Sequence, residues 1–276
     1  SGDRSTAYYD PFRANWVFSL RDYRKEGRVR RYFAAKDFAS ARWSWPKTWG
    51  HRDPDSHARA PMPEEWLVAT NRPNWALYNF DAVAYESVMF GVMEVLYNTP
   101  GDNGDCMKTG LPKQTGLHFC FSRDGRTFVP RDEPDLAPEG WGSGAWDTGY
   151  LSPISGICTV GENEIRIHYS ALRGDGRRTN SARWEENGMY VNGAIGCAVL
   201  RRDGFAGMVA DGHGEIVTKA VAFSGSRLFV NAECRFGEVT AEGLDASGKP
   251  YAPKLAKGTG YEREIRYFND CLAGKK

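Results

Sequence analysis

The sequence has no excess of charge of either sign: its 276 residues include 36 lysines and arginines and 35 aspartates and glutamates, a formal net charge of +1. A nearly neutral protein has no overall field that attracts nucleic acid or an anionic membrane surface. The sequence also has no run of about 18 or more apolar residues, which a membrane-spanning helix needs. We therefore expect neither a nucleic acid nor a membrane as a partner.

Several chemical motifs are also missing. No Gly-rich phosphate loop joins a strand to a helix, and no GxSxG nucleophile elbow is present, so nucleotide chemistry and serine hydrolysis have no support. The cysteines show no CxxC or other metal-ligand spacing. The sequence therefore predicts neither a metal ion nor another cofactor.

The six cysteines bear on the compartment: Cys106, Cys120, Cys158, Cys197, Cys234 and Cys271. Four of them lie in apolar, strand-like segments, which predicts buried thiols in a reducing compartment, with a disulfide set as the alternative. The N-terminus SGDRSTAYYD lacks the basic and apolar regions of a signal peptide. A cytoplasmic location is favoured, and a periplasmic or secreted one stays open if an N-terminal part has been removed.

Strand-turn-strand patterns recur along the chain, with almost no helical periodicity between them. They cover residues 5–22, 81–98, 117–130 and 152–172, and the third contains Asp-Gly, which supplies the positive φ that tight hairpins need. Such units at intervals of roughly 40 to 60 residues are typical of β-propeller blades. A β-sandwich has similar short strands and is the alternative.

The connections and the tail suggest two domains. Residues 44–65, 99–115 and 173–187 are rich in Pro, Gly and charge, as functional or mobile loops are. Short strand patterns continue through the tail. We predict propeller blades in residues 1–205 and a small β-sandwich-like domain in residues 206–276.

Four segments resemble a known group of proteins: DRSTAYYDPFRANWVFSLR, NFDAVAYES, FSRDGRTF and VLRRDGFAGMVADGHGEIVTKAVAFSGSRLFVNAE. They are similar to bacterial glycosyl hydrolases with a five-bladed β-propeller, related in architecture to the fructosidase and arabinanase families. The resemblance covers most of the chain. It implies an all-β fold, a glycoside hydrolase activity and a carbohydrate substrate. It also implies that N-terminal blades are missing from this chain, so that an N-terminal fragment or a longer precursor completes the propeller.

Glycosidic cleavage needs one carboxyl group to protonate the leaving oxygen and a second to act as base or nucleophile. We predict Glu86 as the proton donor, because Tyr85 and the apolar run that follows would raise its pKa. The alternative is a Glu paired with an Arg at a blade interface. Asp81 lies five residues earlier, on the opposite face of a regular strand, so we give it a supporting or substrate-orienting role.

A second acid, Asp147, lies between Trp146 and Tyr150 in GSGAWDTGYLSP. Aromatic faces beside a carboxylate suit a sugar ring, whose C–H face stacks while its hydroxyls bond the acid. We predict Asp147 as a catalytic residue and its two aromatic neighbours as substrate-binding residues. The alternative is a Trp that packs between blades.

Charged residues elsewhere give further candidates for binding. Asp3 and Arg4 precede the first hairpin and are predicted to bind the sugar, with mutual pairing as the alternative. Either Arg4 or Arg52, together with His118, keeps open a polysaccharide lyase, which needs a Tyr or His base and an Arg that neutralises a uronate. A single His within a strand is more often a core residue.

Two further alternatives remain from the sequence. One is a non-catalytic, carbohydrate-binding propeller, in which the acids only form hydrogen bonds. The other concerns the basic cluster of Arg28, Arg30 and Arg31, which we predict to lie on a solvated face or loop, with a phosphate or uronate site as the alternative.

Overall fold

The computed structural model divides the chain into two compact units, residues 1–202 and 203–276. The structure describes residues 3–24, 27–44, 60–67, 75–97, 106, 110–140, 142–176, 183–220, 230–234, 236–245 and 247–250.

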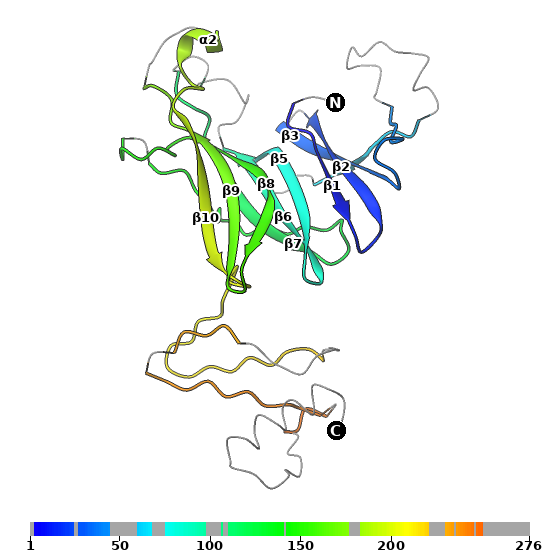
Figure 1. The fold of residues 1–276 in the computed structure, drawn as a ribbon, viewed down its shortest axis with the longest axis vertical. Coiled ribbons are helices and arrows are strands. Elements are labelled where there is room, and N and C mark those ends of the chain that lie inside the picture. The colour runs from blue at the N-terminus through cyan, green and yellow to red at the C-terminus, as the bar shows by residue number, and fades with distance from the viewer. Residues whose placement is uncertain are drawn as a thin grey trace. The chain divides into compact units, whose positions relative to one another are not determined.

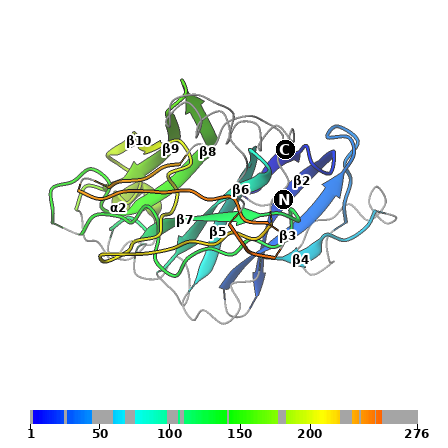
Figure 2. The same ribbon diagram turned by 90° about the horizontal axis from the view of Figure 1, so that it is seen from below.

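The first unit consists of three antiparallel sheets that lie side by side in chain order (Figures 1 and 2). Within each sheet, hydrogen-bonded neighbours are consecutive in the sequence. The first sheet contains β1 (Thr6–Asp10), β2 (Asn15–Arg24), β3 (Gly27–Ala35) and β4 (Glu64–Trp66); the second, β5 (Ala76–Tyr85), β6 (Val88–Leu96) and β7 (Thr115–Ser122); the third, β8 (Tyr150–Val160), β9 (Glu164–Leu172) and β10 (Gly193–Arg201). A single turn of helix, α2 (Trp184–Asn187), precedes β10. The predicted all-β class is confirmed.

Three of the predicted hairpins are present as β1–β2, β5–β6 and β8–β9. The first turns after Asp10, whose Oδ1 accepts backbone N–H bonds from Phe12 at 3.0 Å and Arg13 at 3.3 Å. An Asp that bonds the backbone two and three residues ahead stabilises a tight turn. Asp10 therefore has a structural role at this turn.

The fourth hairpin is only half formed. Asp124 makes the expected turn, because its Oδ1 accepts the N–H groups of Arg126 and Thr127 at 2.8 and 2.7 Å. The chain after the turn does not pair as a strand, and its residue Phe128 is instead buried in the core. Leu117 of β7 instead forms an isolated bridge with Leu136.

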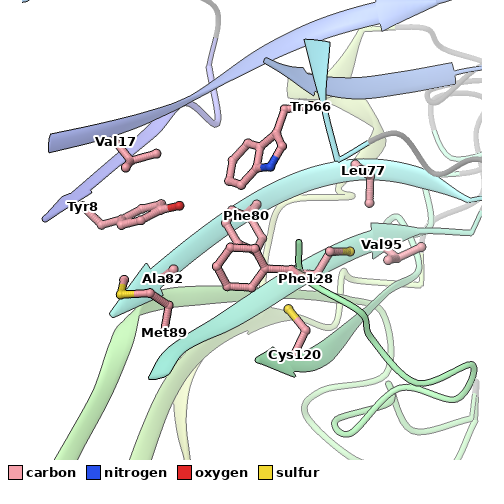
Figure 3. Packing of buried hydrophobic residues seen from close by; sticks show 11 residues of the cluster. Tyr8, Val17, Trp66, Leu77, Phe80, Ala82, Met89, Val95, Cys120 and Phe128 are labelled. Carbon is pink, nitrogen blue, oxygen red and sulfur yellow. The ribbon is translucent and has the colours of Figure 1, made fainter. Parts of the chain in front are cut away.

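The main core lies between the first two sheets (Figure 3). Trp66 and Phe80 meet edge to face with ring centroids 5.0 Å apart, and Phe80 meets Phe128 in the same way at 4.9 Å. Edge-to-face pairs add about 0.5–1.5 kcal/mol to the burial of the rings themselves. Aromatic residues from three distant segments therefore hold the two sheets together.

The free edge of β5 is covered by side chains of the first sheet. Thr6 Oγ1 donates to the carbonyl of Phe80, and Arg30 Nη1 donates to the carbonyl of Tyr78 at 3.4 Å. A buried strand edge must find partners for its backbone groups. These two bonds fix the position of β5, which carries part of the candidate site.

The first strands of the three sheets are close together, with β5 in contact with both β1 and β8. Consecutive antiparallel sheets with adjacent first strands are also the layout of propeller blades. The described residues show no closed ring of blades, so the five-bladed propeller stays a prediction.

The second unit holds a turn, in which the N–H of Asp245 bonds the carbonyl of Lys249 at 2.9 Å, and an isolated bridge between Leu244 and Pro250. Large apolar side chains such as Val209 and Phe236 are exposed. The predicted β-sandwich remains a prediction, because the described part of this unit forms no sheet. Across the described parts of both units, no helix has the length and apolar character needed to cross a membrane.

The cysteines differ from the prediction. Cys106 and Cys120 are buried thiols, whereas Cys158, Cys197 and Cys234 are exposed. Cys197 is exposed because it lies on β10, the outer strand of the third sheet. All five are free, and Cys271 lies outside the described residues.

Candidate functional site

The site centres on Glu94, a fully buried carboxylate on β6. Its Oε2 accepts a hydrogen bond from Ser152 Oγ at 2.9 Å, and within the described residues its Oε1 has no hydrogen-bond partner. Burial raises the pKa of Glu94 to about 7, although Arg4, Arg30 and the Ser152 bond favour the charged form. Its burial therefore favours the protonated form of Glu94.

Arg4 joins this carboxylate through a shared hydroxyl. Its Nη1 donates to Ser152 Oγ at 2.7 Å, and its Nη2 donates to the hydroxyl of Tyr150. Arg4 also has a φ of 59°, a left-handed conformation that costs roughly 1–3 kcal/mol for a residue with a side chain and is found most often at functional sites. The predicted residues Arg4 and Tyr150 are thus brought together beside Glu94.

Asp81 lies on the same face of the second sheet as Glu94. Glu94 pairs with Asn79 across the β5–β6 ladder, and Asp81 is two residues beyond Asn79 on the same strand. Desolvation raises the pKa of Asp81 to about 6, against the opposing effects of backbone bonds from Ala82 and Gly156 and of the Arg30 charge. Two carboxyl groups with raised pKa values are therefore diagonal neighbours.

Cations surround the ring of Tyr78 at this site. Arg28, Lys113 and Arg4 lie 4.1, 4.9 and 5.6 Å from its centroid. Lys113 is buried, and its Nζ donates to the Tyr78 hydroxyl at 2.8 Å. Such cation–π contacts are strongest where water is excluded.

The solvated position predicted for the basic cluster is wrong for Arg28 and Arg30, which are both buried. They lie two residues apart on β3, so both point to the face that meets β5. Arg31, between strand neighbours of that face, points to the other face and pairs with Asp22. Desolvation lowers the pKa of Arg30 to about 9, which Glu94 partly opposes. Arg30 donates to Ser19 Oγ at 3.0 Å and to the Ser19 carbonyl at 2.6 Å.

We call these residues the central site: Arg4, Arg28, Arg30, Tyr78, Asp81, Glu94, Lys113, Tyr150 and Ser152. All three sheets of the first unit contribute to it. Groups of three His, Cys, Asp or Glu side chains that could hold a metal ion are not found among the described residues.

Glu86 lies outside the central site. It occupies the β5–β6 turn with a φ of 49°, and its Oε1 lies 2.6 Å from Nη2 of Arg202. Its side chain is 57% exposed and that of Arg202 is 44% exposed. The apolar surroundings predicted for Glu86 are therefore not found, because the hairpin turn takes it away from the strand residues on either side.

Asp3 is exposed and forms an ion pair with Arg21 rather than with Arg4. The ion pair with Arg21 therefore engages the Asp3 carboxylate, which was predicted to bind sugar hydroxyls. Arg52 lies outside the described residues.

Asp147 and Trp146 form a separate cluster with Tyr169 of β9. The Tyr169 hydroxyl donates to Asp147 Oδ2 at 3.1 Å, and the Trp146 and Tyr169 rings stack with centroids 5.6 Å apart. Burial and the Asp147 charge raise the pKa of Tyr169 to about 12. Within the described residues no hydrogen bond, ion pair or ring contact joins this cluster to Glu94.

His118 lies on the opposite face of the second sheet from Glu94, because it pairs with Met93. Its Nε2 is 2.7 Å from the Tyr97 hydroxyl and its Nδ1 is 3.1 Å from the carbonyl of Arg131. Its ring also packs 4.5 Å from that of Trp75. A buried His with both nitrogens engaged fits the core alternative rather than a base.

Four residues of the central site were missed in the sequence: Tyr78, Glu94, Lys113 and Ser152. Glu94 lies within the apolar run VMFGVMEVLYN, and a single carboxylate inside such a run is the signal that would have indicated it. Lys113 lies in a polar loop whose composition gives no comparable signal.

Comparisons with known proteins give little for this chain. No protein-family model matches it, and no curated protein matches it. It is similar to a solved structure described as "Glycoside hydrolase", with 10% identity and a TM-score of 0.37 over 71% of this chain and 44% of that one. The chain thus spans less than half the length of that structure, and the match is too distant to assign a site or a substrate.

Proposed function

We propose that the protein is a glycoside hydrolase acting on an oligo- or polysaccharide, with Glu94 as proton donor and Asp81 as base. The observation that carries this is the pair of carboxyl groups on one face of the β5–β6 ladder, both with raised pKa values. Pairs of acids whose surroundings separate their pKa values are how glycosidases divide the acid and base roles.

Burial distinguishes the two roles, because Glu94 is fully buried whereas Asp81 is only partly buried. With a pKa of about 7, a large share of Glu94 is protonated at neutral pH, as a general acid must be. With a pKa of about 6, Asp81 is mostly ionised there and can activate a water molecule. Ser152 and Arg4 hold Glu94 in place from the third sheet and the N-terminal segment.

The stereochemistry of cleavage tests how the two carboxyl groups work. Inverting glycosidases place their carboxyl groups about 6.5–9.5 Å apart, to leave room for the water, whereas retaining enzymes need about 5–5.5 Å. NMR of the first-formed product measures directly whether the anomeric carbon is inverted or retained.

Substitutions test whether Glu94, or the Glu86 predicted from the sequence, is the proton donor. Glu94→Gln and Asp81→Asn should each lower turnover of a cleaved glycoside by a factor of about a hundred or more. Glu86→Gln is the matched control, since it makes the same chemical change in an exposed ion pair. Turnover on a panel of glycosides is measured together with thermal melting.

The pattern of results separates the candidates. Activity lost in Glu86→Gln and kept in Glu94→Gln would restore Glu86 as the proton donor. Loss in Asp147→Asn alone would move the chemistry to the Trp146–Tyr169 cluster. If no glycoside is cleaved but sugars bind, the protein is a carbohydrate-binding module.

The contact between Arg4 and the Tyr150 hydroxyl favours a polysaccharide lyase as the second candidate. A lyase base takes the proton from C5 of a uronate while a cation neutralises the carboxylate, after which the C4–O bond breaks, a C4=C5 double bond forms and the leaving oxygen takes up a proton. Tyr150 would be the base and Arg4 the cation. The products decide, because a lyase yields an unsaturated uronide that absorbs ultraviolet light and a hydrolase does not.

A further inference from the structure

The central site contains more cations than carboxylates. Arg4, Arg30 and Lys113 form no ion pair with any carboxylate within the described residues, and their hydrogen bonds there go to neutral oxygens. Glu94 acts on Arg4 and Arg30 through its charge alone, and it is partly protonated near neutral pH. An anion would complete the charge balance.

Lys113 is the clearest case. Its side chain is buried, yet the only hydrogen bond of its ammonium group among the described residues is to the hydroxyl of Tyr78, and the group lies over the ring of the same residue. Taking an ammonium group out of water is costly unless an opposite charge compensates for it. Arg4, which is only half-buried, is a second cation over the ring of Tyr78. It also lies over the ring of Tyr150, 5.0 Å from the Tyr150 centroid.

The surroundings suit a sugar that bears the anion. A guanidinium group binds a carboxylate or sulfate with strong charge-assisted hydrogen bonds. Tyrosine rings bind the apolar face of a sugar. Arg4 is held in a left-handed conformation between Tyr150 and Ser152, so its position is fixed before a ligand binds.

We propose that Arg4 and Lys113 bind the acidic group of a saccharide, either the carboxylate of a uronic acid or a sulfate ester. This inference rests on the proposed function in that the ligand is a saccharide. It names the substrate class as acidic rather than neutral sugars.

Binding of simple probes to the full chain tests the proposal. Calorimetric titrations with glucuronate, glucose 6-sulfate and glucose should show binding of at least one acidic sugar and none of glucose at the same concentration. Glucuronate alone would indicate a uronate, and glucose 6-sulfate alone a sulfate ester. Added salt should weaken the binding. Equal binding of glucose, or of sodium sulfate without a sugar, would overturn the proposal.

Substitutions at Arg4 and Lys113 test whether these two residues bind the acidic group of the sugar. Arg4→Gln and Lys113→Met should each weaken the acidic sugar by about tenfold or more. Arg126→Gln is the matched control, because Arg126 also lies over a tyrosine, 4.2 Å from the Tyr32 centroid, but pairs with Glu64. Binding unchanged in both Arg4→Gln and Lys113→Met would contradict the proposal.

A conservative substitution and melting curves separate loss of binding from loss of folding. Arg4→Lys retains the charge but loses the forked donors, so it should bind more tightly than Arg4→Gln and more weakly than the unchanged protein. Melting curves accompany every variant. A protein that cleaves neutral glycosides and binds no acidic sugar refutes this inference alone, whereas one that binds acidic sugars and cleaves nothing refutes the hydrolase alone.

Discussion

Glu94 shows what a single buried acid requires of its neighbours. Its side chain is fully buried and, among the described residues, receives one hydrogen bond, from Ser152. The charges of Arg4, Arg30 and Arg28 offset part of the desolvation, but its pKa still rises to about 7. The protein therefore stabilises the protonated form of the group that we assign as proton donor.

This residue makes stability depend on pH. The pKa of Glu94 is raised in the folded protein, so the folded chain binds more protons than the unfolded chain between about pH 4.5 and about pH 7. Stability from this group is present at lower pH and is lost as the pH rises, by roughly 3 kcal/mol in all. Glu94→Gln should therefore melt higher than the unchanged protein at about pH 8 and closer to it at about pH 5. Melting curves with the same difference at both pH values would contradict this.

Sequence reasoning at this scale identified turn residues better than site residues. Asp124 was assigned to a turn, and the structure confirms it because its contacts are local. Arg4 and Tyr150 were identified as binding residues, but their contact spans 146 positions in the sequence and no local pattern encodes it. Glu86 was chosen as the proton donor and Glu94 was overlooked, because nearby apolar residues in the sequence do not show which side chain points into the sheet.

At the scale of the element, β6 is the best packed strand of the second sheet. It lies between β5 and β7, and all but its first residue is buried. Gly91, near the middle of β6, has no space for a side chain, since a Cβ would lie 2.8 Å from Phe80 Cε2 and 3.0 Å from Cys120 Sγ. The absence of a side chain at Gly91 is what lets Phe80 reach the core.

Substitution at this glycine gives a direct test. Gly91→Ala should lower the free energy of unfolding by about 1–3 kcal/mol, because a methyl group is forced against a buried ring. Gly140→Ala is the matched control, since no atom lies within 4 Å of the position of its Cβ. Urea unfolding measures both. Equal stability of the two variants would mean that the core adjusts around Phe80 at no cost.

Hairpins were the elements that the sequence predicted best. β1–β2, β5–β6 and β8–β9 each combine a turn with two apolar strands, so the local pattern suffices. β3 was missed because its arginines gave it the composition of a surface. Two of those arginines are buried by contacts with β5, which lies more than 40 residues further along the chain.

At the scale of the molecule, the two units differ in how much they bury. The buried side chains all belong to residues before position 203 within the described parts of the chain. In the second unit, Phe236, Val209 and Met208 are exposed. Hydrophobic burial is the main source of folding stability, so the first unit supplies most of it.

A truncation follows from this difference. A chain ending at Arg202 should retain a cooperative thermal transition within a few degrees of the full chain, because its core is intact. Calorimetry of both chains makes the comparison. A broad, non-cooperative transition in the shorter chain would mean that the first unit depends on residues 203–276.

The covering of the β5 edge by Thr6 and Arg30 has a consequence for biosynthesis. Both residues lie upstream of β5, so they have already left the ribosome when β5 is made. Chains are synthesised at roughly 5–20 residues per second, which gives the first hairpins several seconds in which to fold. The newly made strand then meets a sheet that can cap its open edge at once, and it has less opportunity to pair with another nascent chain.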